Sequence, residues 1–76
     1  MELNQFIALF AEQFEDTDTS VFTKDTLFQE IDEWSSLMAL SVIGLADEEF
    51  GVRIKGDEIS QVKTINGLFE LIKSKK

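Results

Sequence analysis

The sequence predicts an all-α fold: a small four-helix bundle with three longer helices, one short third helix and a long first loop. Apolar residues make up 43% of the 76-residue chain, enough for a folded core, and they recur at intervals of three and four residues. Proline is absent and only four glycines interrupt the chain, so long helices are permitted. Helices with one apolar face pack antiparallel into a bundle. We expect residues 1–76 to form a single domain.

The first helix is predicted near the N-terminus, followed by a long connection. The polar segment Glu15–Ser20 is typical of a loop, because short polar side chains compete for backbone hydrogen bonds. Residues 21–34 show no regular pattern, and a long connection in a small domain is often functional. The helix itself is predicted by one apolar stripe with the spacing i, i+3, i+4, i+7 and i+11: Leu3, Phe6, Ile7, Phe10 and Phe14.

A second helix is predicted from Ser36 to Phe50. Ser35 is a suitable N-cap, because its hydroxyl can accept a hydrogen bond from a free backbone N–H of the first turn. Gly51 directly follows Phe50 and suits the left-handed conformation that closes a helix. Gly44 lies inside this helix, where glycine costs on the order of 1 kcal/mol relative to alanine. It either allows close approach by a partner or is a tolerated small residue of the core.

Two further helices complete the predicted bundle. Asp57–Val62 is expected to form the short third helix, and Thr64 can cap the last one. Lysines at the end of the chain favour the negative end of the last helix dipole. A strand at Gly51–Ile54 is an alternative, but the chain offers it no pairing partner. The inner face of the last helix is expected to consist of Ile65, Leu68, Phe69 and Ile72.

The composition argues against an enzyme. The chain has no cysteine and no histidine, and therefore lacks thiolate chemistry, the usual general base and the commonest metal ligand. It has no glycine-rich phosphate loop. Residues 16–27 begin like a calcium loop, but Val21 stands where glycine is required and Leu27 where a bidentate glutamate is required. We predict no catalytic residue and no metal site.

The charge is negative and uneven. Residues 1–52 hold twelve acids and one base, Lys24, whereas residues 53–76 hold three acids and six bases. Such a surface repels nucleic acid and anionic membranes and favours partners with basic docking patches. The sequence has no apolar run long enough to span a membrane and no basic leader. We expect a cytoplasmic monomer that does not insert into membranes.

The start of the second helix resembles the acyl carrier protein family. The matching segments are Ser35-Ser36-Leu37 and Asp47-Glu48-Glu49-Phe50-Gly51-Val52-Arg53-Ile54. The spacing from Ser36 to Phe50 and Ile54 matches the family without a gap. Asp57-Glu58 and Val62-Lys63-Thr64-Ile65 are similar to the short third helix of the family and the start of its fourth. The resemblance covers most of the chain and is strongest from Ile31 to Ile72.

By this resemblance, Ser36 carries 4'-phosphopantetheine, transferred from coenzyme A by a phosphopantetheinyl transferase. The arm ends in a thiol that holds an acyl group as a thioester, so the protein needs no cysteine. Acyl-loading and acyl-transferring enzymes would then be its further partners. A serine at a helix start is commonly only a cap. Ser35 already fills that role, which favours attachment at Ser36.

The chain departs from the family pattern where partners bind. Ser35 stands in place of the usual Asp, and Met38 and Ser41 stand where acids are common. Glu30, Asp32 and Glu33 lie nearby and are candidates to replace the missing acid. These departures favour a specialised biosynthetic pathway. The residues expected to contact partners are Ser35, Leu37, Met38, Ser41, Asp47 and Glu48. The residues expected to line an acyl-chain pocket, or otherwise the ordinary core, are Phe28, Ile43, Ala46, Ile54, Ile59, Val62 and Leu68.

Two alternatives to an acyl carrier remain at this point. The first is an aminoacyl or peptidyl carrier, since the loading enzyme chooses the cargo. The second is an unmodified carrier-like adaptor that works by docking alone, which the serine at position 35 favours.

Overall fold

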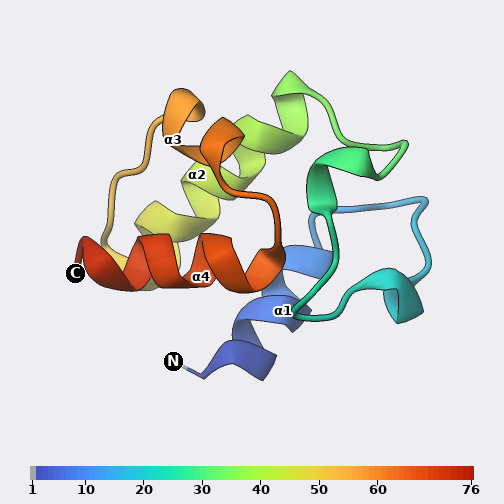
Figure 1. Cartoon of the computed structure of the whole chain (residues 1–76), viewed down its shortest axis with the longest axis horizontal. Coiled ribbons are helices and arrows are strands. Elements are labelled where there is room, and N and C mark those ends of the chain that lie inside the picture. The colour runs from blue at the N-terminus through green and yellow to red at the C-terminus, as the bar shows by residue number, and fades with distance from the viewer. Residues whose placement is uncertain (1) are drawn as a thin grey trace.

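The computed structural model describes residues 2–76, in which four α-helices surround one core (Figure 1). The expected all-α fold is confirmed. The described residues form no strand and only one isolated β-bridge, between Leu27 and Thr64, so the strand alternative at Gly51–Ile54 is wrong. The elements in chain order are α1 (Leu3–Ala11), the 3₁₀ turns η1 (Thr19–Val21) and η2 (Phe28–Glu30), α2 (Ser36–Phe50), α3 (Gly56–Gln61) and α4 (Ile65–Ser74).

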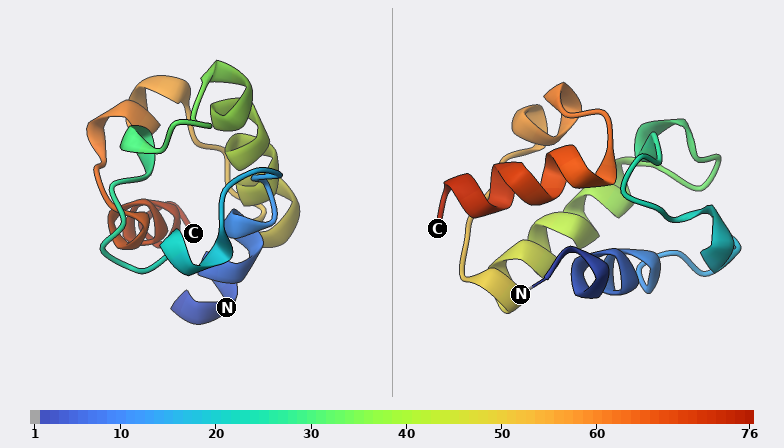
Figure 2. Two further views of the ribbon diagram at one scale, coloured as in Figure 1. Left: turned by 90° about the vertical axis from the view of Figure 1, so that its right-hand side faces the viewer. Right: turned by 60° about the horizontal axis from the view of Figure 1, so that its bottom comes forward.

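The long first connection lies at the end of the molecule opposite the C-terminus, and α2 begins at this same end (Figure 2). The connection contains η1 and η2, and it brings the chain from the end of α1 to the start of α2. The contacts of this connection therefore fix the position of the start of α2. No helix among residues 2–76 is long and apolar enough to cross a membrane.

Aromatic side chains form the part of the core that lies beneath this connection. Phe10 of α1 is fully buried, and its ring stacks nearly parallel to that of Trp34 with 6.4 Å between the ring centroids. Phe28 of η2 meets the same Trp34 edge-on at 4.9 Å. Phe10 thus connects α1 to the segment that leads into α2. The other rings within 6.1 Å of Phe10 are those of Phe6, Phe14, Phe22 and Phe28.

The first helix is shorter than its apolar stripe predicts. It ends at Ala11, and two tighter bonds follow, from Gln13 N to Phe10 O and from Phe14 N to Ala11 O. Phe14 is nevertheless buried and packs against Phe22 at 5.0 Å. Three residues of the stripe, Phe6, Phe10 and Phe14, are buried, whereas Leu3 and Ile7 are only partly buried. A tertiary contact rather than a further helical turn brings Phe14 into the core.

Glu33 holds the first connection in place from the other side. Its carboxylate accepts hydrogen bonds from the backbone N–H of Glu15 at 2.9 Å, from that of Asp16 at 3.1 Å and from the Thr17 hydroxyl at 2.7 Å. The hydrogen bond from Thr17, and those from the backbone, hold the pKa of Glu33 below its usual range. These three hydrogen bonds, which we call the Glu33 clamp, join the segment just after α1 to the segment just before α2.

We expect Glu33→Gln to lower stability at neutral pH and to reduce its dependence on pH. A lowered pKa in the folded state contributes stability above the ordinary glutamate pKa, and this contribution is lost as the pH falls through the folded value. Urea unfolding at neutral and acidic pH measures this. The gap between the wild type and Glu33→Gln should narrow as the pH falls, whereas the exposed Glu30→Gln control should show little gap at either pH. A gap that stays constant with pH would contradict the clamp.

The connection is also bonded to α3 and to the start of α4. The Gln29 side-chain amide donates to the carbonyl oxygens of Ile59 at 3.0 Å and Val62 at 2.8 Å. The backbone N–H of Ile65 donates to Thr26 O at 3.2 Å, and that of Asn66 to Lys24 O at 2.9 Å. These bonds fix η2 and the turn before it against the second half of the chain.

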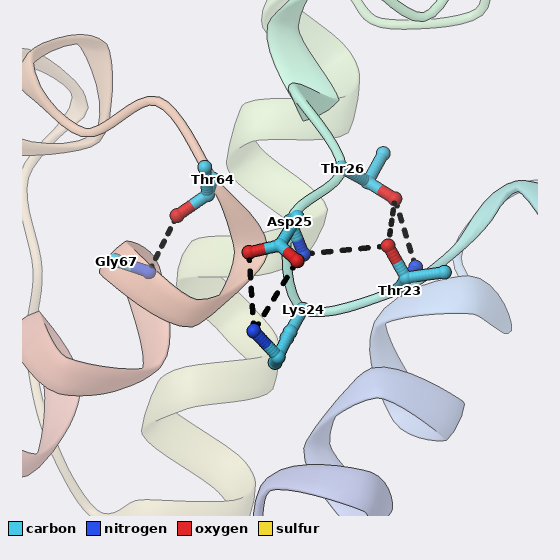
Figure 3. Close-up of polar contacts among 6 residues, drawn as sticks. All are labelled: Thr23, Lys24, Asp25, Thr26, Thr64 and Gly67. Carbon is cyan, nitrogen blue, oxygen red and sulfur yellow. Dashed lines mark hydrogen bonds and ion pairs between the residues drawn. The ribbon is translucent and has the colours of Figure 1, made fainter.

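Side-chain hydrogen bonds stabilise both the start of α4 and the turn at residues 23–26 that faces it. The Thr64 hydroxyl accepts from Gly67 N at 2.9 Å and caps α4, which confirms the cap expected there. On the facing turn, Thr26 Oγ1 accepts from Thr23 N at 2.8 Å, and Lys24 pairs with Asp25 at 3.2 Å (Figure 3). The third helix begins and ends one residue earlier than expected, because Val62 has an extended backbone and serves as its C-cap.

Candidate functional site

The start of α2 is where the sequence placed it. Ser35 has an extended backbone, and its hydroxyl accepts a long hydrogen bond of 3.4 Å from Met38 N. The helix runs from Ser36 to Phe50, and Gly51 closes it at a φ of 66°. This left-handed conformation favours glycine. The predicted bounds and both caps of α2 are confirmed.

Ser36 and Ser35 have different environments although they are neighbours. Both side chains are exposed, but the Ser35 hydroxyl is occupied as the cap of α2. The Ser36 hydroxyl makes no hydrogen bond within residues 2–76. As the first helical residue, Ser36 lies where free backbone N–H groups and the helix dipole favour a negative charge. Its hydroxyl is therefore accessible from solvent.

The backbone before Ser36 is held by the aromatic core. Trp34 is half-buried, and its backbone N–H donates to Ile31 O at 2.9 Å. Its ring packs against Phe10 and Phe28. Because Trp34 is only two residues from Ser36, packing in the core limits the positions that the serine can adopt.

A shallow pocket of about 280 Å³ adjoins Ser36 between the start of α2 and α3. Ile59 of α3 provides a buried apolar wall, and the Gln29 amide that bonds to Ile59 O keeps α3 at this place. Ala39 and Gly56 have small or absent side chains, which leaves the space open. The residues that line the pocket are Gln29, Trp34, Ser35, Ser36, Ala39, Gly56, Ile59 and Ser60.

The residues predicted to line an acyl-chain pocket lie in or against the core. Ile59 also lines the pocket at Ser36, whereas Ile43 and Val62 are partly buried and pack against the core from outside. An acyl pocket formed by the whole set stays a prediction. The remaining members are buried residues of the main cluster: Phe28, Ala46, Ile54 and Leu68.

The residues predicted to contact partners lie at the start of α2 or along it, and all except Met38 are exposed. Ser41, Asp47 and Glu48 are exposed, and Leu37 keeps 74% of its surface open, whereas Met38 is half-buried against the core. Sequence reasoning missed Leu40, which is 62% exposed. A helical wheel would have found it, because Leu40 lies about 200° around the helix from the buried Val42.

The acids before Ser36 are not equivalent. Glu33 accepts hydrogen bonds from the loop after α1, so it is a poor candidate to replace the Asp that the resemblance leads us to expect at position 35. Glu30 and Asp32 are exposed. They stand at a groove of about 620 Å³ that Asp16, Thr17, Val21, Ile31 and Glu33 also line.

Gly44 is exposed on α2, so its interpretation as a small core residue is wrong. A Cβ atom built at Gly44 meets no atom within 4 Å. We expect Gly44→Ala to stabilise the fold by about 1 kcal/mol, because glycine is a poor residue for a helix interior. Urea unfolding measures this gain. An unchanged or lower stability would contradict this expectation. Unchanged loading of the variant would show that no partner needs the space left by the absent side chain of Gly44.

Histidine and cysteine, two residue types common in catalytic sites, do not occur around Ser36. The chain has no histidine or cysteine to act as base or nucleophile, and no cluster of metal ligands occurs in the part of the chain that the structure describes.

The comparison with known proteins agrees with this arrangement. The polyketide-8 synthase acyl carrier protein 2 of Streptomyces avermitilis is 35% identical to this chain over 60 residues, which cover 79% of the chain and 69% of the relative. The chain belongs to the acyl carrier protein family. No family model matches this carrier, and no solved structure matches it. Members of the family are non-catalytic carriers, and the role of the chain is accordingly that of a carrier rather than an enzyme.

Proposed function

We propose that this chain is an acyl carrier protein that holds acyl intermediates as thioesters on a 4'-phosphopantetheine arm attached to Ser36. The observation that carries the proposal is the Ser36 hydroxyl, which is exposed, makes no hydrogen bond within residues 2–76, and stands at the first position of the 15-residue helix α2. The family relationship supplies the identity of the group, because phosphopantetheine is the prosthetic group of these carriers.

The attachment reaction requires a base that the partner enzyme supplies. The Ser36 oxygen attacks the phosphorus of coenzyme A that is bonded to pantetheine, and the bond from this phosphorus to the other phosphate breaks. Adenosine 3',5'-bisphosphate leaves, and a base of the phosphopantetheinyl transferase takes the serine proton. The product is a phosphodiester with one negative charge, which the N-terminus of α2 stabilises. This chain contributes an accessible oxygen and a favourable field.

The pocket beside Ser36 supports a role in holding the cargo. An arm attached to Ser36 has a concave surface at its base, with the buried Ile59 behind it. Apolar cargo gains free energy when it leaves water for such a surface. We propose that cargo enters here and reaches toward the predicted pocket residues of the core by shifting α3, which has six residues and is the shortest α-helix described.

The relative also bears on the cargo. Its name assigns it to a polyketide synthase. We therefore favour an acyl intermediate of a specialised pathway over an aminoacyl or peptidyl group, and we propose acyl-loading and acyl-transferring enzymes as further partners. We propose that residues 1–76 act as one carrier domain.

Intact-protein mass spectrometry tests the proposal. The protein is incubated with a broad-range phosphopantetheinyl transferase and coenzyme A, and a mass gain of one phosphopantetheine is expected. Trypsin then yields the peptide Asp25–Arg53, which contains Ser35, Ser36 and Ser41, because no lysine or arginine lies between Lys24 and Arg53. Fragmentation of this peptide locates the group. An unchanged mass with several transferases would contradict the proposal and favour the docking adaptor.

A further inference from the structure

The face of α2 that adjoins Ser36 is apolar and open. Leu37 is 74% exposed and Leu40 is 62% exposed, the two largest exposures among the large hydrophobic residues described. Ser41 and Gly44 are exposed too. Residues three and four positions apart are neighbours on a helix, so these four positions form one continuous strip. We call this strip, made of Leu37, Leu40, Ser41 and Gly44, the leucine face.

The leucine face also carries no charge. The chain has no Asp, Glu, Lys or Arg from Trp34 to Ala46. The first acid of α2 is Asp47, eleven residues beyond Ser36 and therefore about 16 Å along the helix axis. A cationic side chain placed over the leucine face would lose water and gain no carboxylate in return. A basic patch is thus a poor match for this face, although the carrier as a whole is acidic.

The position of Ser36 indicates what covers the leucine face. Leu37 directly follows Ser36, and Leu40 lies one turn further on. An enzyme that brings coenzyme A to the Ser36 hydroxyl must approach this same end of α2. It therefore covers at least the first turns of the leucine face.

We infer that the enzyme acting on Ser36 docks through an uncharged, apolar surface over Leu37 and Leu40, and that Leu40 is the main specificity-determining contact beyond the modified residue. Cationic groups of the partner are confined to the region of Asp47 and Glu48. The inference rests on the proposed function. For the part of α2 nearest the site, it differs from the expectation of basic docking patches.

The closing experiment compares Leu40→Ala with Leu27→Ala as acceptors for the transferase. Leu27 is the matched control, because it is also an exposed leucine, at 45%, but belongs to the first connection. We expect Leu40→Ala to raise the KM for the carrier about tenfold with little change in kcat, since losing a buried leucine contact corresponds to roughly that factor. Leu27→Ala should stay within about twofold. Circular dichroism confirms that both variants fold.

Salt provides the second measurement. Raising NaCl from about 50 mM to about 500 mM screens exposed charges, so the wild-type KM should change by less than about threefold if the leucine face dominates docking. Asp47→Asn with Glu48→Gln should have a smaller effect than Leu40→Ala.

Each result decides one question. If wild-type protein gains no mass, the proposed function fails and the inference falls with it. If the wild type is loaded but Leu40→Ala is loaded equally well, the inference alone fails. It also fails if the paired Asp47 and Glu48 variant has the larger effect, or if sedimentation shows that a second copy covers the leucine face in a dimer that Leu40→Ala abolishes.

Discussion

Replacing Ser36 with alanine is expected to abolish the mass gain entirely, because the phosphodiester needs the serine oxygen. The hydroxyl makes no hydrogen bond within residues 2–76, so its loss removes no contact of the fold. Alanine is also a favourable helix residue, and we expect the unfolding free energy to stay within about 0.5 kcal/mol of the wild type. The same sample can therefore be shown to be folded and unloaded.

Ser35→Ala is the matched control for this variant. Ser35 is the neighbouring exposed serine, but its hydroxyl accepts from Met38 N and caps α2. Loss of an N-cap costs roughly 0.5–2 kcal/mol, so this variant should be less stable yet still gain the full mass. The bond is long, at 3.4 Å, which favours the lower end of that range.

The pair of variants separates attachment from capping. Loading retained in Ser36→Ala and lost in Ser35→Ala would transfer the attachment to Ser35. A stable Ser35→Ala together with an unstable Ser36→Ala would contradict the hydrogen bonds described for the two serines. Both variants differ from the wild type by the same single oxygen atom, so side-chain size does not explain a difference between them.

The sequence predicted the bounds and caps of α2 well because their signals are local. A cap at Ser35, an apolar helix and a glycine at position 51 define the bounds Ser36–Phe50 without any long-range contact. The exposure of Ser36 follows from its place at the first helical position. The same local logic found the cap at Thr64.

The features that the sequence did not predict depend on contacts between distant residues. The Glu33 carboxylate binds the chain 16 to 18 residues earlier, and no local pattern distinguishes it from Glu30 or Asp32. Gln29 bonds to carbonyl groups 30 and 33 residues later. The end of α1 was misplaced because Phe14 reaches the core through a tight turn. These contacts shape the first connection, where periodicity carries no information.

Phe10→Ala is expected to be the most destabilising single substitution considered, at about 3–5 kcal/mol, because it leaves a large cavity in the core. The Phe10 side chain is fully buried. A domain of this size has a total stability near the lower end of roughly 5–15 kcal/mol, so much of the variant should be unfolded at room temperature. The five aromatic rings that it meets are those of Phe6, Phe14, Phe22, Phe28 and Trp34.

Urea unfolding, followed by the fluorescence of Trp34, measures the loss of unfolding free energy with a probe close to Ser36. Trp34 is the single tryptophan of the chain, it stacks on Phe10, and it is two residues from Ser36. Val21→Ala is the control, because Val21 is 44% exposed, and it should cost less than about 0.5 kcal/mol. Phe10→Leu should fold with an intermediate loss if Phe10→Ala does not fold.

The loading rate then links the core to the site. If Phe10 positions Ser36 only by keeping the domain folded, loading of Phe10→Leu should fall in proportion to its unfolded fraction. A loss of less than about 1 kcal/mol for Phe10→Ala would contradict the central place of this ring. It would mean that hydrogen bonds, including those of Glu33 and Gln29, hold the first connection and the start of α2 without the Phe10 ring.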